Sequence, residues 1–226
     1  KAIGIYEGIL RDYPDSPATE AISFYLGTAY YEQGDFLNSY MRLRSFVPRY
    51  PQSPYKARAL NLQGLGLKSL GRFQDAYEIF KQAAKDAQDA KLSARAEFEM
   101  ADCLYSLGRI EEALSRLEYL RSKYSSSEVS SAVLWRLAEH YFRENKFDVS
   151  RRYLLDIIQS AREDSARDDA YYLLGLAFEK DGRYEEALEA LKKIERDKQK
   201  VYSKIADIYK SLGNFPDAAS YYRKVL

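Results

Sequence analysis

Apolar and small residues recur along the chain in a pattern that alternates between two helices joined by a turn. Apolar positions three and four residues apart, the period of an amphipathic α-helix, flank each turn. A glycine or asparagine marks each turn, at positions 34, 71, 108, 145, 182 and 213. The spacing of this turn marker is therefore 37 residues four times and then 31. The pattern predicts an all-α chain of about 13 helices, with one leading helix followed by six helical hairpins.

Three further positions repeat with the turn marker, and the second hairpin shows what each one requires. Gly64 is small, so it lets the first helix approach the second, where a bulky side chain would push the hairpin open. Gly71 at the turn adopts the left-handed conformation that ends a helix. Phe73 then packs the second helix back, and Ala76 is a second point of close contact.

Two Ser-Pro pairs predict where helices begin. Ser16-Pro17 and Ser53-Pro54 each place an N-cap residue before a proline in the first helical turn. Each pair is therefore expected to start the first helix of the next hairpin.

These recurring residues resemble the tetratricopeptide repeat family over essentially all 226 residues. The resemblance implies an α-solenoid superhelix of antiparallel helix hairpins. Most repeats exceed the family's usual unit by three residues, which we interpret as one more turn on the first helix. We expect a single array over 1–226 that is a piece of a longer protein, with a leading half repeat at 1–15 and hairpins at about 16–52, 53–89, 90–126, 127–163, 164–197 and 198–226.

The junctions between hairpins carry a narrower resemblance. The strings at 13–17 and 50–54 read Tyr-Pro-Asp-Ser-Pro and Tyr-Pro-Gln-Ser-Pro, and a degenerate copy stands at 124–127. They look like junctions of bacterial envelope tetratricopeptide proteins, such as the outer-membrane barrel-assembly lipoprotein and the Tol-Pal coordinator. This likeness favours a periplasmic or envelope-associated location, with a cytoplasmic one as the alternative.

The family resemblance also implies where a partner binds. Stacked hairpins form a superhelix whose first helices line a concave groove. Aromatic residues and arginine dominate binding hot spots, and Trp135 is our leading single candidate. The family's groove-facing positions also fall on Phe24, Leu62, Leu65, Lys68, Arg95, Asp102, Glu139, Arg143, Leu176 and Glu179. The residues that we predict as partner-binding are Tyr25, Tyr31, Asn61, Phe98, Tyr105, Trp135, Arg136, Phe142 and Tyr172.

Each of these assignments has a structural alternative. An aromatic residue at helical spacing packs between repeat units more often than it contacts a partner. A clamp for a C-terminal carboxylate needs a Lys and an Asn one turn apart, and pairs such as Phe24 with Thr28 and Asn61 with Leu65 do not fit.

Residues 192–210 carry seven basic and three acidic side chains, which indicates either a solvated junction or a patch for an acidic protein or lipid headgroups.

Composition excludes several function classes. Thirty-five basic and 34 acidic residues leave a formal charge of +1, so no overall field attracts nucleic acid or a membrane surface. One histidine, His140, and one cysteine, Cys103, cannot build a metal site or a catalytic dyad, so we expect no cofactor, no metal and no enzyme activity. The apolar stretch around 171–178 is much shorter than the roughly 20 residues that span a membrane.

The sequence therefore predicts a non-enzymatic scaffold that binds a peptide, helix or protein partner in its concave groove, in a bacterial envelope or motility assembly. One alternative is an envelope component whose superhelix closes around an apolar small molecule or lipid. Another is a structural spacer that self-associates through exposed terminal repeats.

Overall fold

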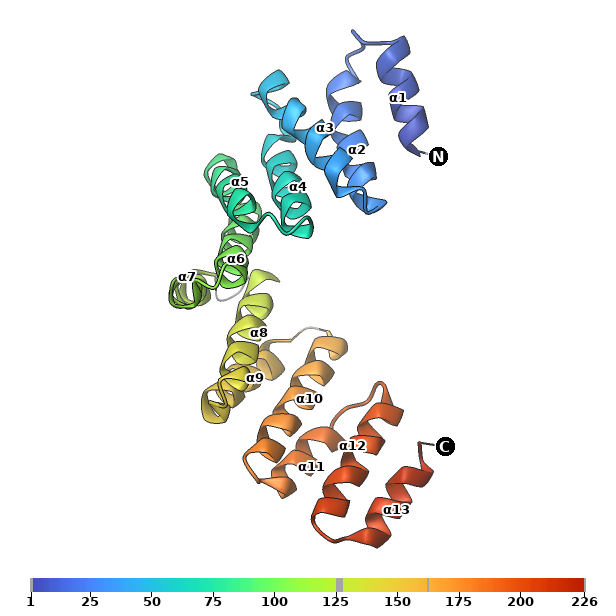
Figure 1. The fold of residues 1–226 in the computed structure, drawn as a ribbon, viewed down its shortest axis with the longest axis vertical. Helices are drawn as coiled ribbons and strands as arrows, with labels where there is room; N and C mark the ends of the chain where they lie inside the picture. Colours follow the sequence, from blue (N-terminus) through green and yellow to red (C-terminus); the bar gives the residue numbers. More distant parts are fainter. Residues whose placement is uncertain (1, 125–127, 162, 226) are drawn as a thin grey trace. The chain divides into compact units, whose positions relative to one another are not determined.

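Thirteen α-helices form the part of the chain that the computed structural model describes, which is residues 2–124, 128–161 and 163–225; no strand occurs there (Figure 1). The first seven are α1 (Ala2–Asp12), α2 (Thr19–Glu32), α3 (Phe36–Arg49), α4 (Lys56–Ser69), α5 (Phe73–Asp86), α6 (Ala90–Ser106) and α7 (Ile110–Lys123). The other six are α8 (Glu128–Arg143), α9 (Phe147–Ser160), α10 (Asp164–Lys180), α11 (Tyr184–Lys192), α12 (Lys198–Ser211) and α13 (Phe215–Arg223). The predicted fold class is confirmed.

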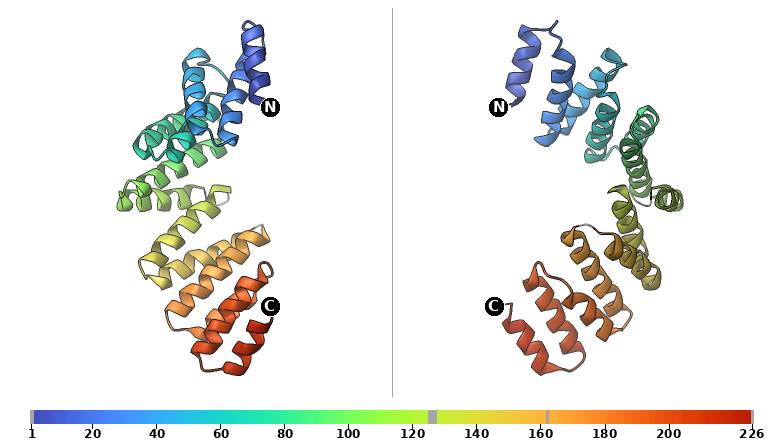
Figure 2. Two further views of the ribbon diagram at one scale, coloured as in Figure 1. Left: turned by 45° about the vertical axis from the view of Figure 1, so that its right-hand side comes forward. Right: turned by 180° about the vertical axis from the view of Figure 1, so that it is seen from behind.

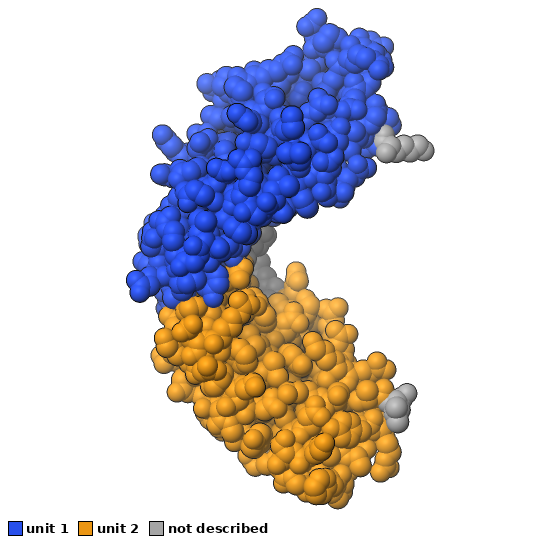
Figure 3. All heavy atoms as spheres, viewed as in Figure 1, with its two compact units in different colours: residues 1–129 blue, residues 130–226 orange. Residues whose placement is uncertain are grey.

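The chain divides into two compact units, residues 1–129 and 130–226 (Figure 3). Within each unit, consecutive helices pack side by side as hairpins (Figure 2). The six predicted hairpins each contain two of the helices, from α2 with α3 to α12 with α13. The single array over 1–226 stays a prediction, and the predicted boundary between 126 and 127 lies outside the described residues.

The turn markers have the backbone conformation that the sequence predicts. The five glycines have φ between 73° and 78°, and Asn145 has φ 58°. This left-handed region suits glycine and, among residues with a side chain, asparagine. In the second hairpin, Gly71 N–H donates to the carbonyl of Lys68 and Arg72 N–H donates to the carbonyl of Leu67, which closes the end of α4.

Close helix approach explains the small residue seven positions before each marker. A Cβ atom on Gly64 would lie 2.6 Å from Cε1 of Phe80, and one on Gly27 would lie 2.5 Å from Leu43. Both partner side chains are fully buried. The first and second helices of these hairpins therefore touch at a point that has no room for a side chain.

The second close-contact position does more than the sequence predicts where it is serine. Ser39 Oγ donates a 2.9 Å hydrogen bond to the carbonyl oxygen of Gly27, and Ser150 Oγ donates a 2.8 Å bond to that of Ala138. Both serines are fully buried. Each therefore links the two helices of its hairpin by a hydrogen bond that the alanine of other repeats cannot make.

The Ser-Pro prediction is wrong in its detail. Helices α2 and α4 begin at Thr19 and Lys56, and their N-cap residues make no side-chain cap. Ser16 and Ser53 instead accept the N–H of the residue two positions on, at 3.2 and 3.0 Å. The serine thus closes a separate turn that precedes each helix, because its hydroxyl reaches the nearer N–H first.

The extra residues of the longer repeats are placed in two ways. Helices α6 and α10 have 17 residues and α8 has 16, as the predicted additional turn requires. Helices α2 and α4 have only 14, and the Ser-Pro turns precede them. The single short spacing of 31 falls on α11, which has nine residues where the earlier second helices have 14.

Candidate functional site

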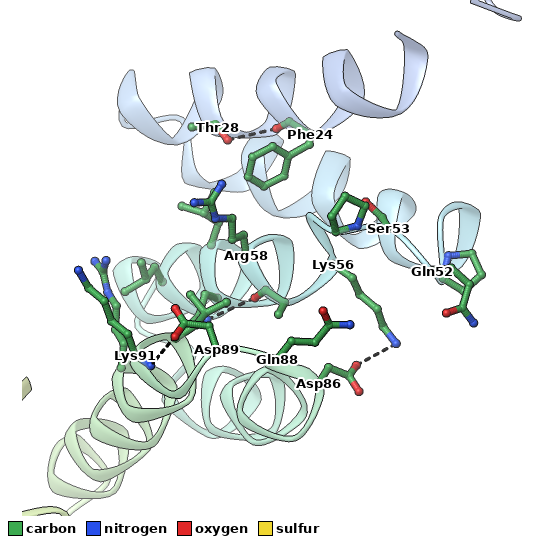
Figure 4. Close-up of a pocket in the computed structure, with 18 residues that line it drawn as sticks. Phe24, Thr28, Gln52, Ser53, Lys56, Arg58, Asp86, Gln88, Asp89 and Lys91 are labelled. Carbon is green, nitrogen blue, oxygen red and sulfur yellow. Dashed lines mark hydrogen bonds and ion pairs between the residues drawn. The ribbon is translucent and has the colours of Figure 1, made fainter. Parts of the chain in front are cut away.

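First helices α2, α4 and α6 line a groove in the first unit with a volume of about 930 Å³ (Figure 4). The segments at 51–54 and 86–89 complete its wall. Apolar side chains include Leu62 and Leu65 on α4 and Leu92 on α6. The groove also carries the basic residues Lys56, Arg58, Lys91 and Arg95 and the acidic residues Asp86 and Asp89.

Both acidic residues of this groove are already engaged. Lys56 Nζ lies 2.9 Å from Asp86 Oδ2, and Asp89 Oδ1 accepts the backbone N–H of Lys91 at 3.1 Å. Figure 4 shows both interactions, with Arg58 extending from α4 toward α2. Arg58 has no hydrogen-bond or ion-pair partner in the described part of the chain.

A second groove lies in the second unit, between α8 and α10, with a volume of about 360 Å³. Trp135, Glu139, Phe142 and Arg143 line it from α8, at a spacing that places them on one helix face. The residues from α10 are Asp169, Tyr172, Leu173 and Leu176. Its lining is therefore mainly aromatic and aliphatic, with three charged side chains.

The three aromatic rings of the second groove differ in their surroundings. Phe142 packs edge-on against Phe147 of α9, with centroids 5.5 Å apart. Lys200 of α12 places its Nζ 4.7 Å above the ring of Tyr172. Trp135 is half-buried and has no ring or hydrogen-bond partner among the described residues. Its indole is therefore the ring most available to a partner.

Family models with the description "Tetratricopeptide repeat" match residues 20–53, 67–131, 135–200 and 199–226. The chain belongs to the tetratricopeptide repeat family. Tetratricopeptide arrays are scaffolds for protein interactions and are typically non-catalytic. No curated protein matches the chain.

Several solved structures share the fold. The apo form of the quorum sensor NprR from B. thuringiensis is 17% identical, with a TM-score of 0.64, over 97% of this chain and 79% of that one. A tetratricopeptide repeat protein from Parabacteroides merdae is 16% identical, with a TM-score of 0.62, over 97% and 78%. The MamA RS-1 ArsTM double mutant is 19% identical, with a TM-score of 0.60, over 75% and 92%. At these identities the similarity shows the fold alone.

The tetratricopeptide array brings together three of its nine predicted partner-binding residues. Trp135, Phe142 and Tyr172 line the groove of the second unit, whereas Asn61 lines that of the first. Arg136 lies outside the second groove's lining and faces Glu139, with a 3.6 Å ion pair.

The remaining four predicted residues line neither groove. Tyr25 is 44% exposed and meets the rings of Phe24 and Tyr55 edge-on. Tyr31 packs edge-on against Phe36 within its own hairpin, at 5.3 Å. Phe98 and Tyr105 are half-buried on α6. Their role in binding stays a prediction.

The sequence missed several groove residues. Lys56 and Arg58 precede the predicted position Asn61 on α4, and Leu92 precedes Arg95 on α6. The signal was the helical period, because Arg58, Leu62 and Leu65 share one face of α4. No sequence pattern predicted that the segments at 51–54 and 86–89 line this groove, because the path of a loop depends on the packing of both hairpins that it joins.

The basic segment at 192–210 is largely engaged by neighbouring rings and one carboxylate. Lys192 donates a 2.9 Å hydrogen bond to the hydroxyl of Tyr209, and Lys193 lies 5.6 Å above the ring of Tyr171. Lys204 forms a 2.7 Å ion pair with Glu179. Ring contacts of this kind are an ordinary way to hold surface lysines, so these contacts favour the structural interpretation of the segment.

The single cysteine, Cys103, and the single histidine, His140, are both buried. Burial raises the pKa of the Cys103 thiol to about 12, so the thiolate is scarce at neutral pH. Burial lowers the pKa of His140, which stacks edge-on against Tyr141. The described residues hold no group of three or more His, Cys, Asp and Glu side chains that could bind a metal ion. Within the same residues, none of the helices combines the length and the apolar character needed to cross a bilayer.

Proposed function

We propose that this tetratricopeptide scaffold holds a segment of a protein partner in the α8–α10 groove of its second unit, with Trp135 as the main anchor. The observation that carries the proposal is the gathering of Trp135, Phe142 and Tyr172 in one groove. Large rings bury extensive apolar area with little loss of conformational entropy, which is why they dominate the energy of protein interfaces.

The lining of this groove suits an apolar side chain flanked by polar groups. Leu173 and Leu176 continue the apolar surface beside the rings, and Glu139, Arg143 and Asp169 add charges of both signs. A binding surface with an apolar centre and a polar rim excludes water from its strongest contacts. The junction sequences at 13–17 and 50–54 favour a bacterial envelope assembly as the setting.

Substitution at Trp135 tests the proposal. Partners are captured from lysate of the source organism with the chain and with Trp135→Ala, and the affinity of each recovered protein is then measured by calorimetry. We expect Trp135→Ala to weaken binding by more than ~1 kcal/mol while the helical circular dichroism signal persists. Phe215→Ala is the matched control, because Phe215 is 66% exposed on α13 and outside the groove.

Two results would contradict this proposal. Equal affinities of the chain and of Trp135→Ala for every recovered partner would place binding elsewhere on the scaffold. Lipid that co-purifies with the chain and is lost in Trp135→Ala would instead favour an apolar small molecule as the occupant.

A further inference from the structure

The groove of the first unit carries positive charge that the described part of the protein does not neutralise. Asp86 and Asp89 are occupied by Lys56 and by the backbone of Lys91. Arg58 and Arg95 are exposed, and neither has an ion-pair partner among the described residues. Two arginine side chains on adjacent first helices thus face one groove with their donors available.

Asn61 adds an unsatisfied acceptor to the same groove. Its Nδ2 donates to the carbonyl of Ala57 at 3.3 Å, whereas its Oδ1 is buried without a hydrogen-bond partner in the described structure. Asn61 is only 6% exposed. A buried acceptor without a partner is rare and destabilising, so its presence on the lining of a groove indicates a missing donor.

The repeat pattern shows that Asn61 is an exception. The residue ten positions before the turn marker is Phe24, Asn61, Phe98, Trp135 and Tyr172 in the first five hairpins. An aromatic ring therefore occupies this position in four of these five hairpins, and the sixth hairpin has Ser203 there. The smaller amide leaves space between α2 and α6, where the larger of the two grooves lies.

The apolar part of the lining restricts what the groove can bind. Leu62 and Leu65 are half-buried on α4, as is Leu92 on α6, so all three retain surface toward the groove. A ligand made only of anionic groups would leave this surface uncovered. A ligand that alternates carboxylates with apolar side chains would cover it and pair with the arginines as well.

We propose that this groove binds an extended, acidic segment of a partner protein, with its carboxylates on Arg58 and Arg95 and a backbone N–H donated to Asn61 Oδ1 after the amide turns toward the segment. The segment is extended because the N–H groups within a helix are already used by its own carbonyls. No residue of this site belongs to the second-unit groove, so the two proposals stand or fall separately.

Short labelled peptides test the proposal by fluorescence anisotropy with the full chain. The panel carries two glutamates at varied spacing among leucine and alanine, and a matched panel replaces each glutamate by glutamine. The test variant is Arg58→Gln with Arg95→Gln. Its control is Arg44→Gln with Arg152→Gln, which removes the same charge from exposed arginines on α3 and α9 outside the groove.

We expect the acidic peptides to bind with a dissociation constant at least about tenfold lower than that of their glutamine counterparts. The Arg58/Arg95 variant should lose at least about tenfold in affinity, and the control should lose less than about twofold. Binding should also weaken as salt is added, because salt screens exposed charge pairs.

Several results would overturn this proposal. Equal binding of glutamine and glutamate peptides would remove the role of charge, and an equal loss in the control would show attraction to the general surface. Inorganic polyphosphate that competes with the same potency in both double variants would indicate an unspecific anion surface. No binding by any acidic peptide at ~1 mM would show that the groove has no such ligand.

Discussion

Two glycines of helix α4 should respond in opposite directions to the same substitution. Gly64 and Gly66 are both buried, and alanine is the better helix former by about 0.8–1.0 kcal/mol at either position. A Cβ on Gly66 would meet the carbonyl oxygen of Phe36 at 3.4 Å and Cβ of Tyr40 at 3.9 Å, which are ordinary contacts. Gly66→Ala should therefore stabilise the chain by about 0.5–1 kcal/mol.

At Gly64 the added methyl group collides with a ring. It would lie 2.6, 2.7 and 2.8 Å from three atoms of Phe80, and Phe80 is fully buried against Leu67 and Met100. Overpacking of this kind costs about 1–3 kcal/mol, which exceeds the gain in helix propensity of about 1 kcal/mol. Gly64→Ala should therefore destabilise the chain by about 1–2 kcal/mol.

Urea denaturation and thermal denaturation, followed by circular dichroism, compare the two variants directly. For a chain of this length, each kcal/mol shifts the thermal midpoint by about 2–4 °C. Because repeat arrays do not always unfold in one step, hydrogen exchange of the α4 and α5 amides should locate the change in this hairpin. Shifts of the same sign and size in both variants would show that the approach of α4 to α5 does not decide the effect.

Three further substitutions test the charge and polarity of the chain. Lys68→Met removes the ammonium group that lies 2.6 Å from the carboxylate of Glu99 and 2.5 Å from that of Asp102, so we expect a loss of about 1–3 kcal/mol in urea denaturation at neutral pH. Asn61→Leu should raise stability by about 1 kcal/mol, because it removes an unsatisfied acceptor, and should lower affinity for the acidic peptides. Burial lowers the pKa of His140 from its ordinary value of 6.5, so the unfolded state takes up the proton first as the pH falls. The free energy of unfolding should therefore decrease as the pH drops below about 6.5. His140→Gln should flatten this dependence in a pH series of thermal denaturation.

The sequence predicted those features of the fold that depend on one residue and its backbone. Left-handed φ at Asn145 and the absence of room for a side chain at Gly64 were both expected from residue type. The first residues of the helices that follow Ser16 and Ser53 were not predicted correctly. A serine turn that precedes the helix and a serine N-cap of the helix differ by a single hydrogen bond. A difference of about 1 kcal/mol between two local arrangements cannot be read from the residue type alone.

The candidate sites were less predictable, because a groove depends on side chains from several helices at once. Trp135, Phe142 and Tyr172 could be proposed together, since their repeat positions place them on neighbouring first helices. That the charge of Arg58 is unpaired within the described residues could not be predicted from the sequence, because it depends on which carboxylates already form ion pairs with the surrounding lysines. Pairing between side chains is decided by rotamers and distances, which the repeat pattern does not specify.

The pairs between adjacent first helices show how far one repeat position can vary without changing the fold. Lys68 and Glu179 each lie three residues before a turn glycine, and their partners Glu99 and Lys204 each lie nine residues before the next one. The same inter-repeat contact is therefore made in both units, at 2.6 and 2.7 Å, with the charges exchanged.

The stacking of adjacent repeats thus requires that the two residues of such an ion pair have opposite charges, but it does not fix which of the two is basic. The same freedom allows an amide at position 61 and an indole at 135, so that equivalent points of two repeats line grooves of different chemistry. Because neither side chain makes a hydrogen bond or ring contact to another helix in the described residues, a change of ligand at either groove requires no change of fold. Exchange of residues 61 and 135 should therefore alter what each unit binds while the helical hairpins persist.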